Sequence, residues 1–130
     1  MSEWVTRGVR LITERDGAGP VAIRGDTVTY NVRLFLHRGD EVSFDAEIIA
    51  RARSSVSVRR IDDCELIDHR VELGRRHASA GIEKALIGMR TGGFREVEIA
   101  PHLAYGDTGI PGRIPANALL RAQIWLRRIG

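Results

Sequence analysis

The chain lacks most of the features that mark secreted, disulfide-bonded or membrane proteins. Its one cysteine, Cys64, excludes an internal disulfide and gives no sign of an oxidising compartment. Residues 1–7 contain no apolar run of the kind found in signal peptides. No later stretch approaches the roughly eighteen apolar residues that a membrane-spanning helix needs. These absences predict a cytoplasmic protein without a membrane partner.

Lysine and aromatic residues are also scarce. All but one of the 20 basic residues are arginine, and Phe, Trp and Tyr together form 5% of the chain. The net charge is only +3, so the arginine excess indicates genomic base composition rather than a nucleic-acid partner. A nucleic-acid-binding domain usually carries a basic stripe with stacking aromatic side chains. The alternative is a nucleic-acid or acidic partner whose affinity falls steeply with salt. It would use Arg51, Arg53, Arg59, Arg60, Arg75 and Arg76.

What is present is the composition of one globular domain spanning residues 1–130, with 43% hydrophobic and 28% charged residues. Alternation of apolar and polar residues with a period of two predicts antiparallel strands near residues 9–13, 28–36, 95–99 and 120–126. The run from Val28 through Tyr30, Val32 and Leu34 to Leu36 is the clearest.

One helix is predicted over residues 80–89. Its apolar face consists of Ile82, Ala85, Leu86 and Met89. Ser79 is the expected N-cap, and the glycines at 92–93 are expected to end the helix. Many strands with one short helix on a sheet face define an α+β fold.

Residues 45–70 form a long excursion with no clear period, in which we expect one extra strand near residues 64–72. Its arginines are expected on a solvated face. The apolar residues of the excursion that the strand and helix patterns leave unassigned are Ile48, Ile49 and Leu66.

The side chains that usually carry acid–base, nucleophilic or metal chemistry form no recognisable arrangement. The four histidines have no metal-ligand spacing, and the acidic neighbours of Cys64 disfavour a reactive thiolate. The stretch AYGDTGIPGRIP at residues 104–115 is rich in glycine, but it leads into a strand without a lysine, so it is not a phosphate loop. We expect no metal and no cofactor, and a rigid loop that overhangs a groove.

That loop resembles the signature of the FKBP-type peptidyl-prolyl cis-trans isomerase family. Residues 99–101 and 118–120 around it, the helix region at 73–92 and the strand entry at 24–28 resemble the same family, in the right order, over most of residues 8–128. The resemblance implies an FKBP-like curved antiparallel sheet wrapped around one short helix, with a proline pocket between them.

The resemblance also implies an activity. Rotation about a peptide bond crosses a barrier of about 18–20 kcal/mol, and isomerisation of X–Pro bonds is correspondingly slow. An apolar pocket that binds the twisted amide more tightly than either planar form accelerates isomerisation without a nucleophile, metal or cofactor. The implied partners are proline-containing peptide or protein segments, and the implied inhibitors are the family's macrolides. The alternative is a non-catalytic module that binds proline segments or acts like a chaperone.

Two residues carry the catalytic role that the resemblance implies. Tyr105 matches the family's pocket tyrosine, whose hydroxyl hydrogen-bonds the substrate carbonyl. The family's Phe-Asp pair falls on Phe44 and Asp45 if two extra turn residues are allowed, and on Val42 and Ser43 if they are not. In the first alignment Asp45 accepts a hydrogen bond from a pocket group and Phe44 forms a wall.

The remaining pocket positions depart from the family pattern. Ile82 replaces the usual tryptophan floor, and Val32 and Ala122 stand where a second tyrosine and a phenylalanine are common. Smaller side chains predict a wider pocket and a weak enzyme, unless the excursion refills the space. The full set of predicted substrate-binding residues is Val32, Phe44, Ala78, Ser79, Ile82, Ile110, Ile114 and Ala122.

Overall fold

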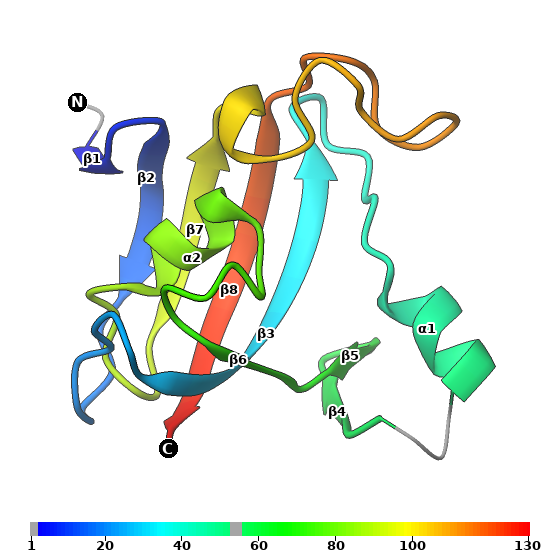
Figure 1. Ribbon diagram of the computed structural model, residues 1–130. Helices are drawn as coiled ribbons and strands as arrows, with labels where there is room; N and C mark the ends of the chain where they lie inside the picture. The colour runs from blue at the N-terminus through cyan, green and yellow to red at the C-terminus, as the bar shows by residue number, and fades with distance from the viewer. Residues whose placement is uncertain (1–2, 53–55) are drawn as a thin grey trace.

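The computed structural model describes residues 3–52 and 56–130, and its framework is an antiparallel sheet of six strands (Figure 1). The strands are arranged in the order β1-β2-β7-β8-β3-β6. The long strands β3 and β8 run side by side in the middle of this sheet, where Val32 pairs with Ile124. The strands are β1 (Glu3–Thr6), β2 (Val9–Arg15), β3 (Thr27–Leu36), β6 (His69–Glu72), β7 (Phe94–Ile99) and β8 (Leu120–Ile129).

Helix α2 (Ala80–Leu86) lies across one face of this sheet (Figure 1). Its residues Gly81, Ile82, Ala85 and Leu86 are buried. A Cβ atom at Gly81 would lie 2.3 Å from Cγ2 of Ile99 on β7, so only glycine permits this close approach. The core lies between α2 and the sheet and includes the alternating residues of β3 and β8.

The ends of α2 differ from the prediction. The helix stops at Leu86 because Ile87 is extended and Gly88 adopts a positive φ of 92°, so the predicted stop at residues 92–93 is wrong. Met89 is buried but lies beyond the helix. Ser79 occupies the N-cap position, yet its side chain makes no capping hydrogen bond.

The excursion contains more regular structure than the single strand expected. A second helix, α1 (Asp45–Ala52), is followed by a two-stranded hairpin of β4 (Val58–Ile61) and β5 (Cys64–Ile67), and the chain then enters the main sheet as β6. The expected strand near residues 64–72 is therefore two strands in different sheets. Helix α1 and the β4–β5 hairpin lie beside β3 and β6 (Figure 1). No helix in the described part of the chain is long and apolar enough to cross a membrane.

The segment between β7 and β8 begins with the 3₁₀ helix η1 (Pro101–Leu103) and continues as a chain of turns. Gly109 has a positive φ of 61°, and a Cβ atom there would lie 2.3 Å from the carbonyl oxygen of Ile114. The loop is closed by an antiparallel bridge between Ile110 and Ile114. It is thus a compact loop above one end of the sheet (Figure 1).

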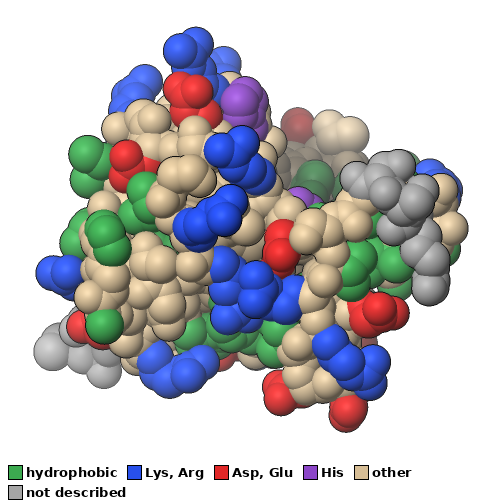
Figure 2. All heavy atoms as spheres, turned by 90° about the horizontal axis from the view of Figure 1, so that it is seen from below, with side chains coloured by type: hydrophobic (Ala, Val, Ile, Leu, Met, Phe, Trp, Pro, Cys, Tyr) green, Lys and Arg blue, Asp and Glu red, His purple; other side chains and the backbone are tan. Residues whose placement is uncertain are grey.

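The charged side chains are not spread evenly over the surface. Seen from below, Lys and Arg side chains gather in the middle of the visible face, between the main body and the part that carries the excursion (Figure 2).

Candidate functional site

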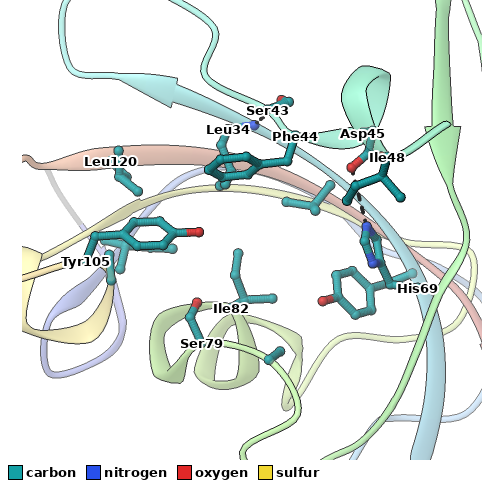
Figure 3. Close-up of a pocket in the computed structure, with 15 residues that line it drawn as sticks. Leu34, Ser43, Phe44, Asp45, Ile48, His69, Ser79, Ile82, Tyr105 and Leu120 are labelled. Atoms are coloured by element: carbon teal, nitrogen blue, oxygen red, sulfur yellow. Dashed lines mark hydrogen bonds and ion pairs between the residues drawn. The ribbon is translucent and has the colours of Figure 1, made fainter. Parts of the chain in front are cut away.

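An apolar cavity of about 250 Å³ opens between α2, the sheet and the start of α1 (Figure 3). Ile82 of α2 lies on one side of it, and Leu34 and Leu120 line the sheet side. Cavities of this kind, apolar with a few polar groups, are the usual form of small-ligand sites. The lining residues are Tyr30, Val32, Leu34, Ser43, Phe44, Asp45, Ile48, His69, Ala78, Ser79, Ile82, Ile99, Ala104, Tyr105 and Leu120.

Tyr105 extends from the loop after η1 with its hydroxyl directed into the cavity (Figure 3). Among the described residues, no side chain or backbone group forms a hydrogen bond with this hydroxyl. Burial raises its pKa, so the hydroxyl stays protonated near neutral pH and remains a hydrogen-bond donor. An unpartnered donor at the edge of an apolar cavity is suited to a carbonyl oxygen of a bound ligand.

Phe44 forms the wall beside Tyr105. The two ring centroids are 6.3 Å apart and tilted by 57°. The Arg113 guanidinium lies 4.7 Å from the Phe44 ring centroid and donates a hydrogen bond of 3.1 Å to the carbonyl oxygen of Ser43. Arg113 also forms an ion pair with Glu47 of α1. The loop and the first turn of α1 are thereby joined next to the cavity, which fixes the position of Phe44.

The polar end of the cavity is formed by Asp45, His69 and Tyr30. Asp45 is 5% exposed, and its Oδ2 accepts a hydrogen bond of 2.8 Å from the backbone N–H of Ile67. Its Oδ1 lies 3.5 Å from Nε2 of His69 (Figure 3), a long contact that becomes an ion pair when the imidazole is protonated.

The His69 ring in turn stacks on Tyr30, with ring centroids 5.3 Å apart. Tyr30 and His69 are cross-strand partners on β3 and β6, which explains why the rings meet. Burial, followed by the nearby Asp45 carboxylate, raises the pKa of Tyr30, which therefore stays neutral. This end of the cavity offers polar groups that hold one another in place.

The sequence was compared with known families, and the match is extensive. The family model described as FKBP-type peptidyl-prolyl cis-trans isomerase matches residues 19–126. The chain belongs to this family. It is 32% identical to FK506-binding protein 1A of Neurospora crassa over 87% of this chain and 81% of that protein. It is 31% identical to FK506-binding protein 4 of Aspergillus fumigatus over 95% of this chain and 21% of that protein.

The FKBP-type chain is much shorter than several of these relatives. The matching region, 45% of this chain in each case, spans 12% of FK506-binding protein 4 of Chaetomium thermophilum and 34% of the bovine peptidyl-prolyl cis-trans isomerase FKBP11. A crystal structure of a peptidyl-prolyl cis-trans isomerase from Pseudomonas syringae shares its fold, with a TM-score of 0.74 at 20% identity over 99% of this chain and 80% of that one. The predicted α+β, FKBP-like fold class is confirmed, with α1 as a second helix beside the predicted one.

Most of the residues predicted for the FKBP-type pocket line the cavity together. The Phe44 and Asp45 pair lies at the cavity. In the ungapped alternative Val42 is in the core, and Ser43 lines the cavity while its hydroxyl oxygen accepts a hydrogen bond of 2.9 Å from the backbone N–H of Leu34. The predicted residues that line the cavity are Val32, Phe44, Asp45, Ala78, Ser79, Ile82 and Tyr105.

Ile110, Ile114 and Ala122 do not line the FKBP-type cavity. Ile114 is 2% exposed and belongs to the core, and Ile110 is tied to it by the bridge that closes the loop. Ala122 shares a sheet face with Leu120, but it is fully buried and its short side chain does not reach the cavity. The structure places these three residues outside the lining of this cavity, and their contact with substrate stays a prediction.

Several lining residues were not predicted. Tyr30 and Leu34 are on the same alternating run as Val32, so the period of β3 was a sufficient signal for both. The cavity therefore does contain a second tyrosine, Tyr30. It lies two residues before Val32, which is where an ungapped alignment places the family's second tyrosine. Ile48 of α1 also lines the cavity, so the excursion does fill part of the space. His69 had no sequence signal, because only the fold brings β6 beside β3.

The described residues offer no grouping that suggests a metal. Within residues 3–52 and 56–130, no three His, Cys, Asp or Glu side chains gather as they would to hold an ion. The features of this FKBP-type cavity that the structure shows are its shape, its apolar walls and the Tyr105 hydroxyl.

Proposed function

We propose that this protein is a peptidyl-prolyl cis-trans isomerase that acts on X–Pro bonds in peptide and protein segments. The observation that carries the proposal is the apolar cavity into which Tyr105 directs an unpartnered hydroxyl, in a chain of the FKBP-type family. The cavity of about 250 Å³ accommodates a proline ring with part of the preceding residue.

The mechanism is differential binding without covalent chemistry. At the transition state the amide is twisted, its resonance is lost and its nitrogen carries less positive character. Apolar walls favour this less polar form over the planar amide, which keeps its hydration in water. Ile82 supports the proline ring from below and Phe44 bounds it at the side, while the Tyr105 hydroxyl holds a substrate carbonyl oxygen.

The groups at the polar end of the cavity position the substrate and do not react with it. Asp45 is held by the Ile67 N–H, and the stacked pair of Tyr30 and His69 keeps the carboxylate facing the cavity. In this arrangement the Asp45 side chain is a fixed polar group near the twisted amide. We assign Asp45 and Tyr105 the roles of electrostatic support and carbonyl donor.

The same cavity is the proposed site for macrolides such as FK506, the compound in the relatives' names. The aliphatic floor at Ile82 offers less contact area than an aromatic one, so docking and catalysis are both expected to be weaker than with an aromatic floor. We propose a cytoplasmic location, which is supported by the single free cysteine.

The test is a protease-coupled assay on tetrapeptides that contain one X–Pro bond, with the wild type and Tyr105→Phe. We expect the wild type to accelerate isomerisation and the variant to lose about two- to tenfold in kcat/KM, the worth of one net hydrogen bond. The free energy of unfolding should not change, because the hydroxyl has no partner in the described structure. A folded wild type that binds the peptides without accelerating them would contradict the enzyme and indicate the binding module.

A further inference from the structure

A second hollow lies on the other face of the sheet from the proline cavity. On β3 and β6, Tyr30 pairs with His69, and both side chains face the proline cavity. The neighbouring cross-strand pair, Thr29 and Arg70, must therefore point to the opposite face of the sheet. On that side a groove of about 480 Å³ is enclosed by β3, β6, β8 and the β4–β5 hairpin. Its lining residues are Thr29, Ser57, Arg59, Asp68, Arg70, Arg127 and Arg128, and we call it the arginine groove.

The arginine groove carries an uncompensated positive charge. Among the described residues that line it, four are arginines and Asp68 is the one carboxylate. Within residues 3–52 and 56–130, the side chains of Arg70 and Arg128 form no hydrogen bond or ion pair. The arginines elsewhere on the sheet are mostly neutralised by glutamates, in the pairs Arg10–Glu98, Arg33–Glu41, Arg95–Glu14 and Arg121–Glu96. The concentration of basic side chains on the lower face is visible in Figure 2.

An irregularity of the sheet places two of these arginines side by side. The pairing of β3 with β8 shifts between Thr29 and Tyr30, where Thr29 pairs with Arg128 and Tyr30 with Leu126. Arg127 is thus an extra residue in β8, and Arg127 and Arg128 both line the groove although they are consecutive. Bulges of this kind redirect side chains next to functional sites.

A fully buried asparagine organises the groove. Asn31 is 0% exposed, and its Nδ2 donates to the carbonyl oxygen of Ile67 at 2.8 Å and to Oδ1 of Asp68 at 2.7 Å. Its Oδ1 accepts a hydrogen bond of 2.7 Å from Nε of Arg127. Asp68 in turn accepts from Nε of Arg59 at 3.1 Å. Arg127 and Arg59 are therefore held by a continuous network before any ligand arrives. Within the described residues, the terminal nitrogens of Arg127 remain available for a ligand.

The surroundings of Arg127 within this network disfavour its positive charge. Burial and the neighbouring Arg59 lower the pKa of Arg127, against the opposing effect of Asp68. The buried hydroxyl of Thr29 has no hydrogen-bond partner within the described residues. An anion in the groove would relieve the repulsion between the guanidiniums and provide an acceptor for the hydroxyl.

We propose that the arginine groove binds an anion with several phosphoryl groups, either a free oligophosphate or the phosphate chain of a nucleotide. Planar guanidiniums match phosphate oxygens with paired hydrogen bonds, and several of them suit more than one phosphoryl group. The groove is larger than a single phosphate needs. None of its described lining residues is aromatic, so they offer no stacking surface of the kind that a nucleic-acid strand would use.

The experiment is calorimetric titration of the full chain with inorganic tripolyphosphate and, separately, with ATP, at about 0.15 M salt to screen weak surface contacts. The test variant is Arg70→Gln with Arg128→Gln, which removes two exposed, unpaired guanidiniums. The matched control is Arg7→Gln with Arg24→Gln, which removes the same charge from exposed positions outside the groove.

We expect saturable binding by the wild type, a loss of at least about tenfold in the test variant and less than about twofold in the control. Equal affinity for both probes supports the phosphate chain as the ligand, and tighter ATP binding supports a nucleotide. In ¹H–¹⁵N spectra, the side-chain amide of Asn31 should shift on titration, because it belongs to the network that holds Arg127.

No saturable binding, or equal losses in the two double variants, would overturn the proposal. Binding of a single-stranded oligonucleotide that strengthens with its length would replace the discrete site with a nucleic-acid surface. Isomerase activity on short peptides should be unchanged in both double variants, so this result and the proposed isomerase function succeed or fail separately.

Discussion

Asp45 is a buried carboxylate with two separate duties. It is the first residue of α1, where a negative charge is favoured by the helix dipole, and it binds the backbone N–H of Ile67 across the excursion. Its second oxygen faces His69 in the cavity. The residue that we assign to the substrate site therefore also connects α1 to β5, and substitutions can separate the two roles.

Replacing Asp45 by alanine leaves the Ile67 N–H without its acceptor, so we expect Asp45→Ala to lose about 1–3 kcal/mol of unfolding free energy. Asp45→Asn keeps an acceptor oxygen, and its loss should be smaller, although both variants should lower kcat/KM. Urea titration and the protease-coupled assay measure the two effects. Equal stability of wild type and Asp45→Ala would show that the Ile67 contact does not hold the excursion.

At the scale of secondary-structure elements, the position of α2 decides the depth of the cavity. The helix approaches β7 so closely that Gly81 has no room for a side chain, and Ile82 is brought under the cavity as its floor. Phe44, just before α1, and Ile48 of α1 close the opposite side. The cavity exists because two short helices from distant parts of the sequence flank the same sheet.

Gly81→Ala tests this close approach. Helix propensity alone would make alanine about 1 kcal/mol more favourable than glycine. The new Cβ, however, would lie 2.3 Å from Ile99 Cγ2 and 3.0 Å from the Leu103 carbonyl oxygen, and Ile99 is 1% exposed. We expect a net loss of about 1–3 kcal/mol in chemical denaturation. The exposed neighbour Ala80→Gly reports the propensity effect alone, and a stabilised Gly81→Ala would show that α2 can move away from β7.

At the scale of the whole molecule, carboxylates join the excursion and the segment that leads into it to the main sheet. Hydrogen bonds from Arg33 and Ser43 outweigh burial and lower the pKa of Glu41. Burial raises the pKa of Asp68, but hydrogen bonds from Asn31, Arg59 and Ser57 outweigh it and hold the pKa below its usual value. Both groups therefore bind protons less readily in the folded state than in the unfolded state.

The sign of the pH dependence follows. A lowered carboxylate pKa contributes stability that is complete above the unfolded values of about 3.9 for Asp and 4.3 for Glu, and that is lost as the pH falls through the lower folded values. We expect the melting temperature to decrease as the pH is lowered from about 4.5 to about 2.5, a range that includes both unfolded pKa values. Asp68→Asn should show a shallower fall. Identical slopes in the two proteins would contradict the assigned role of Asp68.

Most of the sheet and the family were predictable from local patterns. The period of two in β3 and β8 indicates which side chains enter the core, and the loop signature at 104–115 indicates Tyr105. Family resemblance also indicated Ile82, and it placed the Phe-Asp pair either at Phe44 and Asp45 or at Val42 and Ser43. These features depend on residues close together in the chain, so periodicity and motif spacing are sufficient to find them.

Only the tertiary structure decided the contacts between residues that are far apart in the sequence. His69 meets Asp45 and Tyr30 only because β6 pairs with β3, and Ile110 and Ile114 leave the cavity because the loop closes on itself. The arginine groove likewise needs three strands, a hairpin and a register shift to gather its guanidiniums. The sequence by itself determined the alternation of the strands, the apolar face of α2 and the loop that carries Tyr105, because these are local properties of the chain. Which side chains share a cavity was decided by strand pairing and close packing, whose favourable contacts form only when the whole sheet is assembled.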